Sequence, residues 1–495
     1  MSGFPLVFLG AGFCLVTGLG PVASAVHAET LQEALAFAYG ANPALQARRA
    51  QSRGADEAVP QALAGWRPTV TANGDVREGH YTPPSAFALA PHSTISKGPW
   101  RTPHDMNVSM TEALYQGGGT VAGLQRAKSS IQTDRAQLQT VEQSVFLDTA
   151  TAYMNVLRDM AMVGLNTNNE ELLRRQLEAA QNRFQVGEIT RTDVSEAESR
   201  LAGAKASRIQ AEGQLASSQA NYERVVGLPP RGLVQPAPIK GLPQSVEEAV
   251  SIAREDNPNR VAAVYTSQAA DHAVDVARSG LLPTVSVQAD SGKAWPPTDN
   301  YIRTSQSEIL LRGTAPLYEQ GATYSQLRAA KHVVGQRRLE AVASERTAVD
   351  AARGAWQSLQ TARAQIRSFK AQIAANEVAL NGVSQESKVG ARTVLDVLNA
   401  EEELVASRAN LIGAERDEMV AEYTLMNTIG QLTVRGLGLP VKPYDPGVHY
   451  REVKNQWVGG NDQADRDAAP SANATGGTLP VLASGKSGGR FSGDN

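Results

Sequence analysis

The sequence has 495 residues, a formal net charge of −3 and only 5% aromatic residues. A charge so close to neutral gives no support for a nucleic-acid partner, which requires a basic face. Few aromatic residues argue against large compact cores. The abundance of Ala, Gln, Glu, Arg and Leu is typical of long helices and coiled coils.

Residues 1–28 have the pattern of a secretory signal peptide, with an apolar core at 6–19 and two small-x-small motifs within 23–28. The only cysteine, Cys14, lies in this core, and the bulky Phe13 before it disfavours lipid attachment. The mature chain would lack cysteine, which excludes disulfides and thiol chemistry. No later run of 18 apolar residues predicts a helical membrane span, whereas strand-type spans give a much weaker signal.

One segment of the chain is duplicated. Asn42-Pro43 opens a helical pattern that ends at Pro68, and Asn257-Pro258 opens another that ends at Pro283. The two prolines are 25 positions apart in each copy, and the copies are 215 positions apart. Strand-like sequence follows Pro68 and Pro283, so we expect helix–strand junctions there. Pro60 interrupts only the first copy, where it predicts a bend.

The repeat divides the rest of the chain. Residues 29–228 form the first predicted repeat, 229–243 a proline-rich linker and 244–440 the second repeat. Residues 441–495 are a C-terminal tail, predicted to be largely disordered from about 458 because it is rich in Gly, Ser, Asp and Ala.

Each repeat holds a long stretch without proline, at 104–228 and at 317–439. Because proline is expelled from helix interiors, the two stretches predict two long helical hairpins. A helix from Gly118 to Gly187 would be about 105 Å long at ~1.5 Å per residue.

One glycine breaks each of these stretches, Gly187 in the first and Gly390 in the second, where a helix C-terminus with positive φ is expected. Thr192 or Asp193 is the predicted cap of the returning helix in the first repeat, and Thr393 in the second.

Four segments alternate apolar and polar residues, at 69–76, 105–111, 284–290 and 308–315. Each approaches the ~9–11 residues with which a strand crosses a bilayer. Four strands cannot close a barrel, and open edges are not tolerated in lipid, so we expect the sheet to close by oligomerisation. Apolar side chains would face lipid and polar ones a watery lumen.

Over about residues 29–440 the chain resembles the TolC family of outer-membrane channel-tunnels. The resemblance is carried by residues 389–400 (VGARTVLDVLNA), by 183–194, and by the related motifs at 114–118 and 317–321. It implies a mainly α fold with a membrane β-barrel: long antiparallel coiled-coil hairpins form a tunnel, and four strands per protomer close as a 12-strand barrel in a homotrimer.

The resemblance also implies location and partners. The trimer would lie in the lipid of the bacterial outer membrane and extend into the periplasm. It would dock with a periplasmic adaptor protein and an inner-membrane ABC or proton-driven exporter. The exported substrate would be small molecules or, in type I secretion, unfolded protein.

Site residues are implied as well. Asp396 matches a position in an acidic pore constriction, and Asn399 stands where many members have a second Asp. Gly187 and Gly390 mark the helix turns beside which adaptor tips would dock.

A closed-state latch is implied at Arg392, which would pair with Thr192 and Asp193. Ser387 replaces a Tyr that joins this latch in some members.

Two other classes of protein are alternatives to a channel. A periplasmic adaptor or a coiled-coil structural protein without a channel would also contain helical hairpins, but two hairpins and four alternating strands favour the channel. No enzyme is expected, because the sequence has neither metal-ligand histidine spacing nor a complete phosphate loop. We therefore expect no cofactor, no metal and no catalytic residue.

Overall fold

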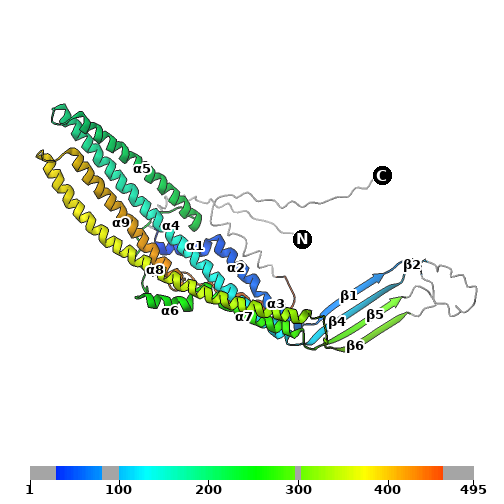
Figure 1. The fold of residues 1–495 in the computed structure, drawn as a ribbon. Helices are drawn as coiled ribbons and strands as arrows, with labels where there is room; N and C mark the ends of the chain where they lie inside the picture. Colours follow the sequence, from blue (N-terminus) through cyan, green and yellow to red (C-terminus); the bar gives the residue numbers. More distant parts are fainter. Residues whose placement is uncertain (1–28, 81–99, 296–302, 461–495) are drawn as a thin grey trace, which may run out of the picture.

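The computed structural model describes residues 29–80, 100–295 and 303–460. The predicted signal peptide, most of the loops at the strand tips and most of the predicted disordered tail lie outside the described residues. Long helices lie side by side over most of the molecule, and a sheet extends from one end (Figure 1).

The two predicted repeats share one order of main elements: two helices, two long strands and two long helices. The first has α1 (Leu31–Ala41), α2 (Pro43–Asp56), α3 (Ala58–Leu63), η1 (Ala64–Trp66), β1 (Thr69–Val76), β4 (His104–Gln116), α4 (Gly119–Gln185) and α5 (Arg191–Val226), with β2 (Gly79–His80) and β3 (Trp100–Arg101) between β1 and β4. The second has α6 (Val246–Asp256), α7 (Pro258–Ser279), β5 (Thr284–Trp295), β6 (Thr304–Thr314), α8 (Ala322–Lys388) and α9 (Val394–Thr428), and α10 (Gly447–Val453) follows. Residues 229–243 form no helix or strand.

The duplicated Asn-Pro pair is a structural joint. The side-chain oxygen of Asn42 accepts hydrogen bonds from the first amides of α2, and Asn257 does the same for α7. Proline follows at the first helical position, where its missing N–H costs nothing. The Asn42 amide donates to Val225 O at 3.1 Å, and the Asn257 amide to Thr428 O at 2.9 Å. Each joint therefore ties the helix leading to the sheet to the end of the returning helix of its own repeat.

The helix–strand junctions lie at the predicted prolines. Helical structure ends at Trp66 before Pro68 and at Ser279 before Pro283, and β1 and β5 begin one residue after the prolines. The difference at Pro60 is also confirmed, because α2 ends at Asp56 and α3 follows, whereas α7 continues without a break.

The helices α4 and α8 have 67 residues each, about 100 Å at ~1.5 Å per residue. Each packs against its returning partner, α4 with α5 and α8 with α9. Within the described residues, none of the helices combines the length and the apolar character needed to cross a membrane.

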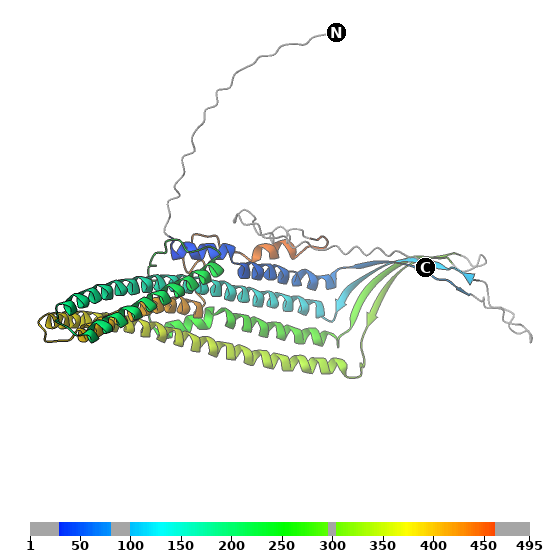
Figure 2. The same cartoon turned by 90° about the horizontal axis from the view of Figure 1, so that it is seen from above.

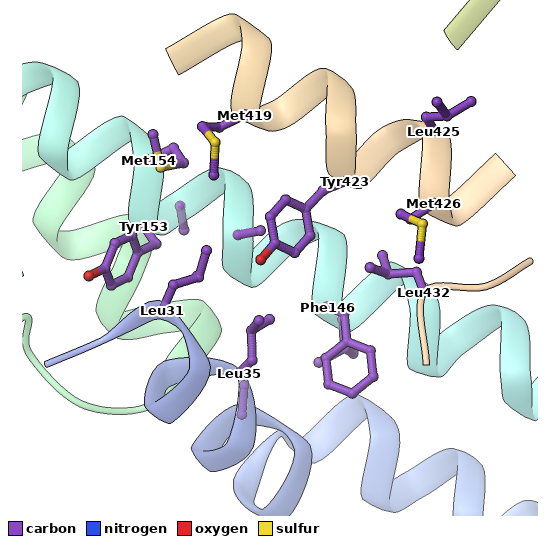
Figure 3. Packing of buried hydrophobic residues seen from close by; sticks show 14 of the residues in the cluster. Leu31, Leu35, Phe146, Tyr153, Met154, Met419, Tyr423, Leu425, Met426 and Leu432 are labelled. Atoms are coloured by element: carbon purple, nitrogen blue, oxygen red, sulfur yellow. The ribbon is translucent and has the colours of Figure 1, made fainter. Parts of the chain in front are cut away.

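The main apolar core lies near the middle of the molecule, where α1, α4 and α9 meet (Figure 3). The labelled side chains in this core are Leu31, Leu35, Phe146, Tyr153, Met154, Met419, Tyr423, Leu425, Met426 and Leu432. The Tyr153 hydroxyl donates to Val234 O at 2.6 Å and so holds the linker between the repeats on α4. Burial raises the pKa of Tyr153 to about 12, so the hydroxyl keeps its proton.

The four long strands form one antiparallel sheet in the order β1-β4-β5-β6, which curves away from the helices (Figure 2). Its two faces differ as the alternation predicts. One cross-strand row reads Val70, Met110, Ala289, Ile309, and the next row, on the other face, reads Thr71, Ser109, Asp290, Glu308. The strands β1 and β6 are exposed along their whole length, and within the described residues no second sheet covers either face.

The first part of the C-terminal tail packs on the first repeat. His449 Nδ1 lies 3.3 Å from Asp56 Oδ2, and Arg67 donates to Gln456 O at 2.7 Å. The Arg67 guanidinium also stacks on Trp457 at 4.8 Å. Residues 447–457 thus cover the side of α2 and α3.

Gly430 generates a stability prediction. It follows α9 with φ +81, and a Cβ there would overlap the carbonyl oxygen of Asp256. Its counterpart Gly227 follows α5 with φ +98, but a Cβ there would meet no backbone atom within 4 Å. Gly227→Ala should cost about 1–2 kcal/mol for the left-handed conformation alone. Gly430→Ala should cost clearly more, because the backbone of the α6–α7 joint must also move.

Thermal unfolding of the two purified variants in detergent measures this difference. Equal losses of Tm in both variants would show that the close approach to Asp256 carries no cost.

Candidate functional site

The two helical hairpins end in turns of the same construction. Gly187 and Gly390 follow α4 and α8 with φ of +81 and +78, which confirms the predicted left-handed positions. The Gly187 amide donates to Phe184 O at 3.0 Å, and the Gly390 amide to Ser387 O at 3.1 Å. No atom lies within 4 Å of a Cβ built at either glycine. Glycine is therefore required by the backbone conformation rather than by crowding.

The caps of the returning helices correct one prediction. Thr393 caps α9 as expected, but α5 is capped by Thr190, and neither Thr192 nor Asp193 is its N-cap. In both helices the carboxylate three residues after the threonine completes a capping box, Asp193 with Thr190 and Asp396 with Thr393. Since Asp193 needs its partner three residues earlier, the cap falls at Thr190 and leaves Thr192 in the first turn.

Asp396 is held by this cap. Its Oδ2 accepts from the Thr393 amide at 3.0 Å and from the Thr393 hydroxyl at 2.9 Å. These two hydrogen bonds, the amide first, lower the pKa of Asp396, and the charge of nearby Arg392 adds a smaller effect. The carboxylate therefore stays ionised into acidic solution, and it is half-buried at the tip of the molecule.

Arg392 lies across its own turn. Its Nε donates to Glu386 Oε2 at 3.0 Å, as Arg183 donates to Glu188 at 3.1 Å in the first hairpin. Within one protomer, the described side chains of Thr192 and Asp193 form no bond with Arg392. Ser387 supplies its backbone carbonyl to the turn.

Polar contacts near the tips join the two hairpins. Arg200 of α5 donates to Asn399 Oδ1 at 2.8 Å and forms an ion pair with Glu402, both on α9. Gln176 of α4 donates to Glu401 of α9. Asn399 is thus turned toward the first hairpin.

Glu401 is the buried member of this group, only 6% exposed. Burial raises the pKa of Glu401 to about 7, and the hydrogen bond from Gln176 opposes that rise. Its second oxygen, Oε2, has no hydrogen-bond partner among the described residues. Sequence reasoning missed Glu401, although it interrupts an apolar stripe of α9 that contains Leu398 and Leu404.

The arrangement offers charge and hydrogen bonding rather than a catalytic centre. Among the described residues, no three His, Cys, Asp or Glu side chains are grouped so that they could hold a metal ion. The tips combine a half-buried carboxylate that stays ionised, two open glycine turns and polar contacts that connect the hairpins.

The chain matches a family model described as "Outer membrane efflux protein" over residues 33–228 and 249–431. It is 33% identical over 456 residues to the outer membrane efflux protein BepC of Brucella suis biovar 1 (strain 1330), covering 91% of this chain and 96% of that protein. It is 26% identical over 426 residues to the outer membrane protein TolC of Vibrio cholerae serotype O1, covering 84% and 94%. The crystal structure of the CmeC outer membrane channel of Campylobacter jejuni superposes with a TM-score of 0.72 at 14% identity, over 86% of this chain and 89% of that one.

Glu401 predicts a pH dependence of stability. Because its folded pKa is about 7 and its unfolded pKa lies near 4.5, the folded chain holds a proton that the unfolded chain releases earlier. Its contribution to stability therefore falls as pH rises from about 4.5 to about 7, by at most about 3 kcal/mol. Glu401→Gln should raise Tm at pH 7.5 and hardly change it at pH 4.5.

Thermal unfolding of the wild type and the variant at both pH values is the measurement. Glu402→Gln, at the exposed neighbouring position, serves as control and should not reproduce the pattern. An equal effect of Glu401→Gln at both pH values would contradict the buried, protonated carboxyl.

Proposed function

This chain belongs to the outer membrane efflux protein family, and we propose that three copies of it form an exit duct that crosses the outer membrane and spans the periplasm. As a member of this family it is an outer-membrane channel with a helical tunnel and a β-barrel.

One observation carries the proposal: a sheet with one exposed apolar face and one exposed polar face stands at the end of helices about 100 Å long. Apolar side chains exposed in this way suit lipid, and polar ones suit a water-filled lumen. Unpaired strand edges cost several kcal/mol per backbone group in a bilayer, so copies must join edge to edge. Three copies of four strands give twelve, the barrel of the channel-tunnels that the sequence resembles.

The tips of the hairpins would then form the periplasmic entrance. We place Asp396 in a constriction of three carboxylates, with Asn399 turned aside by Arg200. The depressed pKa of Asp396 supports this role, because the ring would remain negative at the pH of the periplasm. A ring of carboxylates attracts cations and disfavours anions.

We propose the partners that the family resemblance implies. A periplasmic adaptor would dock beside the open turns at Gly187 and Gly390, and an inner-membrane ABC or proton-driven exporter would supply the energy. The duct itself would perform no chemistry. The name of the Brucella relative supports efflux, for which we propose small molecules as the substrate, and type I protein secretion would use the same duct.

Membrane fractionation with a non-boiled gel tests the proposal at its base. A trimer in the outer-membrane fraction is expected. A soluble monomer would instead support the alternative of an adaptor or a coiled-coil structural protein without a channel.

Arg392 predicts a change in conductance. In the closed trimer we expect it to pair with Thr192 and Asp193 of another copy, in place of the Glu386 contact seen within one chain. Arg392→Ser should therefore raise single-channel conductance in planar bilayers several-fold. Arg183→Ser removes the corresponding ion pair of the first hairpin and is the matched control. Unchanged conductance in Arg392→Ser, or an equal rise in Arg183→Ser, would remove Arg392 from the latch.

Gly390 predicts a loss of docking. Gly390→Asp adds a charged side chain to an open turn at positive φ, so export should be abolished while trimers still reach the outer membrane. Gly382→Asp places the same charge on exposed α8 surface before the turn and should leave export intact. Substrate export and trimer yield are measured together in cells. Normal export by Gly390→Asp would count against this docking site.

A further inference from the structure

The strand pairing within one protomer indicates how the strands of two protomers pair. This inference rests on the proposed function, because it assumes that protomers join through their sheet edges. Within the described residues, β1 pairs with β4 alone and β6 with β5 alone, so each has one free edge. Joining copies therefore means pairing β6 of one protomer with β1 of the next.

The internal repeat makes the strands equivalent in pairs. Thr69 of β1 lies opposite Thr111 of β4, and Thr284 of β5 lies opposite Thr314 of β6. A shift of 215 positions carries β1 onto β5, as it carries Pro68 onto Pro283. A shift of 203 carries β4 onto β6, as it carries Gly187 onto Gly390. The strand pairs β1–β4 and β5–β6 therefore have the same register.

The β4–β5 contact between the two repeats can therefore serve as a template for the contact between protomers. In the chain, β4 of the first repeat pairs with β5 of the second, with Ser109 opposite Asp290. Across protomers, β6 of the second repeat meets β1 of the first. We propose that β6 pairs with β1 of the partner subunit in the register of β4 with β5, which places Arg312 opposite Asp75 of the partner subunit on the lumen face.

The charges in one protomer agree with this register. Arg312 lies on exposed β6, and its side chain forms no ion pair or hydrogen bond with any residue that the structure describes. Asp75 is 59% exposed, and its nearest cation, the Arg77 guanidinium, is 3.9 Å away. Both residues lie on the polar face, so the proposed pairing brings two poorly partnered opposite charges together.

Other registers fit worse. A slip by one residue would turn the polar face of β6 toward the apolar face of β1. A slip by two in one direction would set Arg312 opposite Arg77, and in the other direction opposite Asn73. Like charges directly opposite each other destabilise a sheet, so of these the proposed register alone pairs Arg312 with a carboxylate.

The apolar face agrees as well. The proposed register sets Leu311, 65% exposed, opposite Val76 of the partner subunit, 76% exposed. Past the irregularity at Ala113, Tyr115 lies opposite Val285 inside the chain. The equivalent pair between copies is Tyr318, 84% exposed and four residues beyond the end of β6, with Val70 of the partner subunit, 65% exposed. In this register, large exposed apolar side chains of two protomers lie opposite each other at their contact. Because an exposed ion pair stabilises little, Arg312 and Asp75 contribute register more than strength.

Cysteine cross-linking tests the register. In a Cys14→Ser background, Arg312→Cys with Asp75→Cys should give covalent trimers on a boiled gel after oxidation or treatment with a short bifunctional thiol reagent. Ser109→Cys with Asp290→Cys is the equivalent pair inside one chain and should cross-link as a monomer, which shows that the geometry permits the bond. Glu308→Cys with Asp75→Cys is displaced by four residues, roughly 13 Å, and should remain monomeric.

The outcomes separate the two proposals. Covalent trimers from the Arg312–Asp75 pair alone support the register. Native trimers on the non-boiled gel without that cross-link, or with the displaced one, overturn the register and leave the exit duct standing. Absence of native trimers in the wild type overturns the exit duct itself.

A charge exchange tests the ion pair separately. Arg312→Asp alone should lower the temperature at which native trimers dissociate on the gel, because it opposes two carboxylates. Adding Asp75→Arg should restore much of the loss. A double variant no more resistant to heat than the single one would overturn the ion pair.

Discussion

The unpaired backbone groups along the free edges of β1 and β6 determine how this molecule must assemble. A backbone amide or carbonyl left unpaired in lipid costs several kcal/mol, and β1 and β6 each present a full edge of such groups. Water can satisfy them only while the chain is outside the bilayer. The sheet is therefore stable in its place only as part of a closed ring, and the rest of the chain is arranged so that identical copies can close it.

The internal duplication simplifies the closure of the sheet. One chain carries two nearly equivalent units, so a single kind of strand contact can serve within and between protomers. The Asn-Pro joints at Asn42 and Asn257 repeat the same hydrogen bonds, which orients both helix–strand arms alike. The units still differ where helices must bend differently, since α2 stops at Asp56 and α7 does not stop at the equivalent position.

Features that depend on a few neighbouring residues could be predicted from the sequence. Pro68 and Pro283 mark junctions because proline constrains its own backbone, and Gly187 and Gly390 end helices because they accept positive φ. The N-cap of α5 is Thr190 rather than Thr192 or Asp193, and its spacing of three from Asp193, the spacing of a capping box, is visible in the sequence. The environment of Glu401 could not be found this way, since its hydrogen-bond partner Gln176 is 225 positions away. The proposed pairing of Arg392 in an assembly would depend likewise on another chain.

The distribution of apolar and polar contacts along the rods has a mechanical consequence. The apolar core around Phe146 and Tyr153 holds α4 firmly, and the tip near Gln185 lies roughly 50 Å away at ~1.5 Å per residue. Each helical hairpin is therefore fixed at the core and free to rotate about it at the tip. A rotation of about 5° there would displace the tip by roughly 4 Å over that length. Near the tips the hairpins share polar contacts such as Arg200 with Asn399, which can exchange with water at small cost. They share only a small apolar cluster there, of Leu173, Ala204 and Leu398, so the tips are held together by less apolar contact than the core.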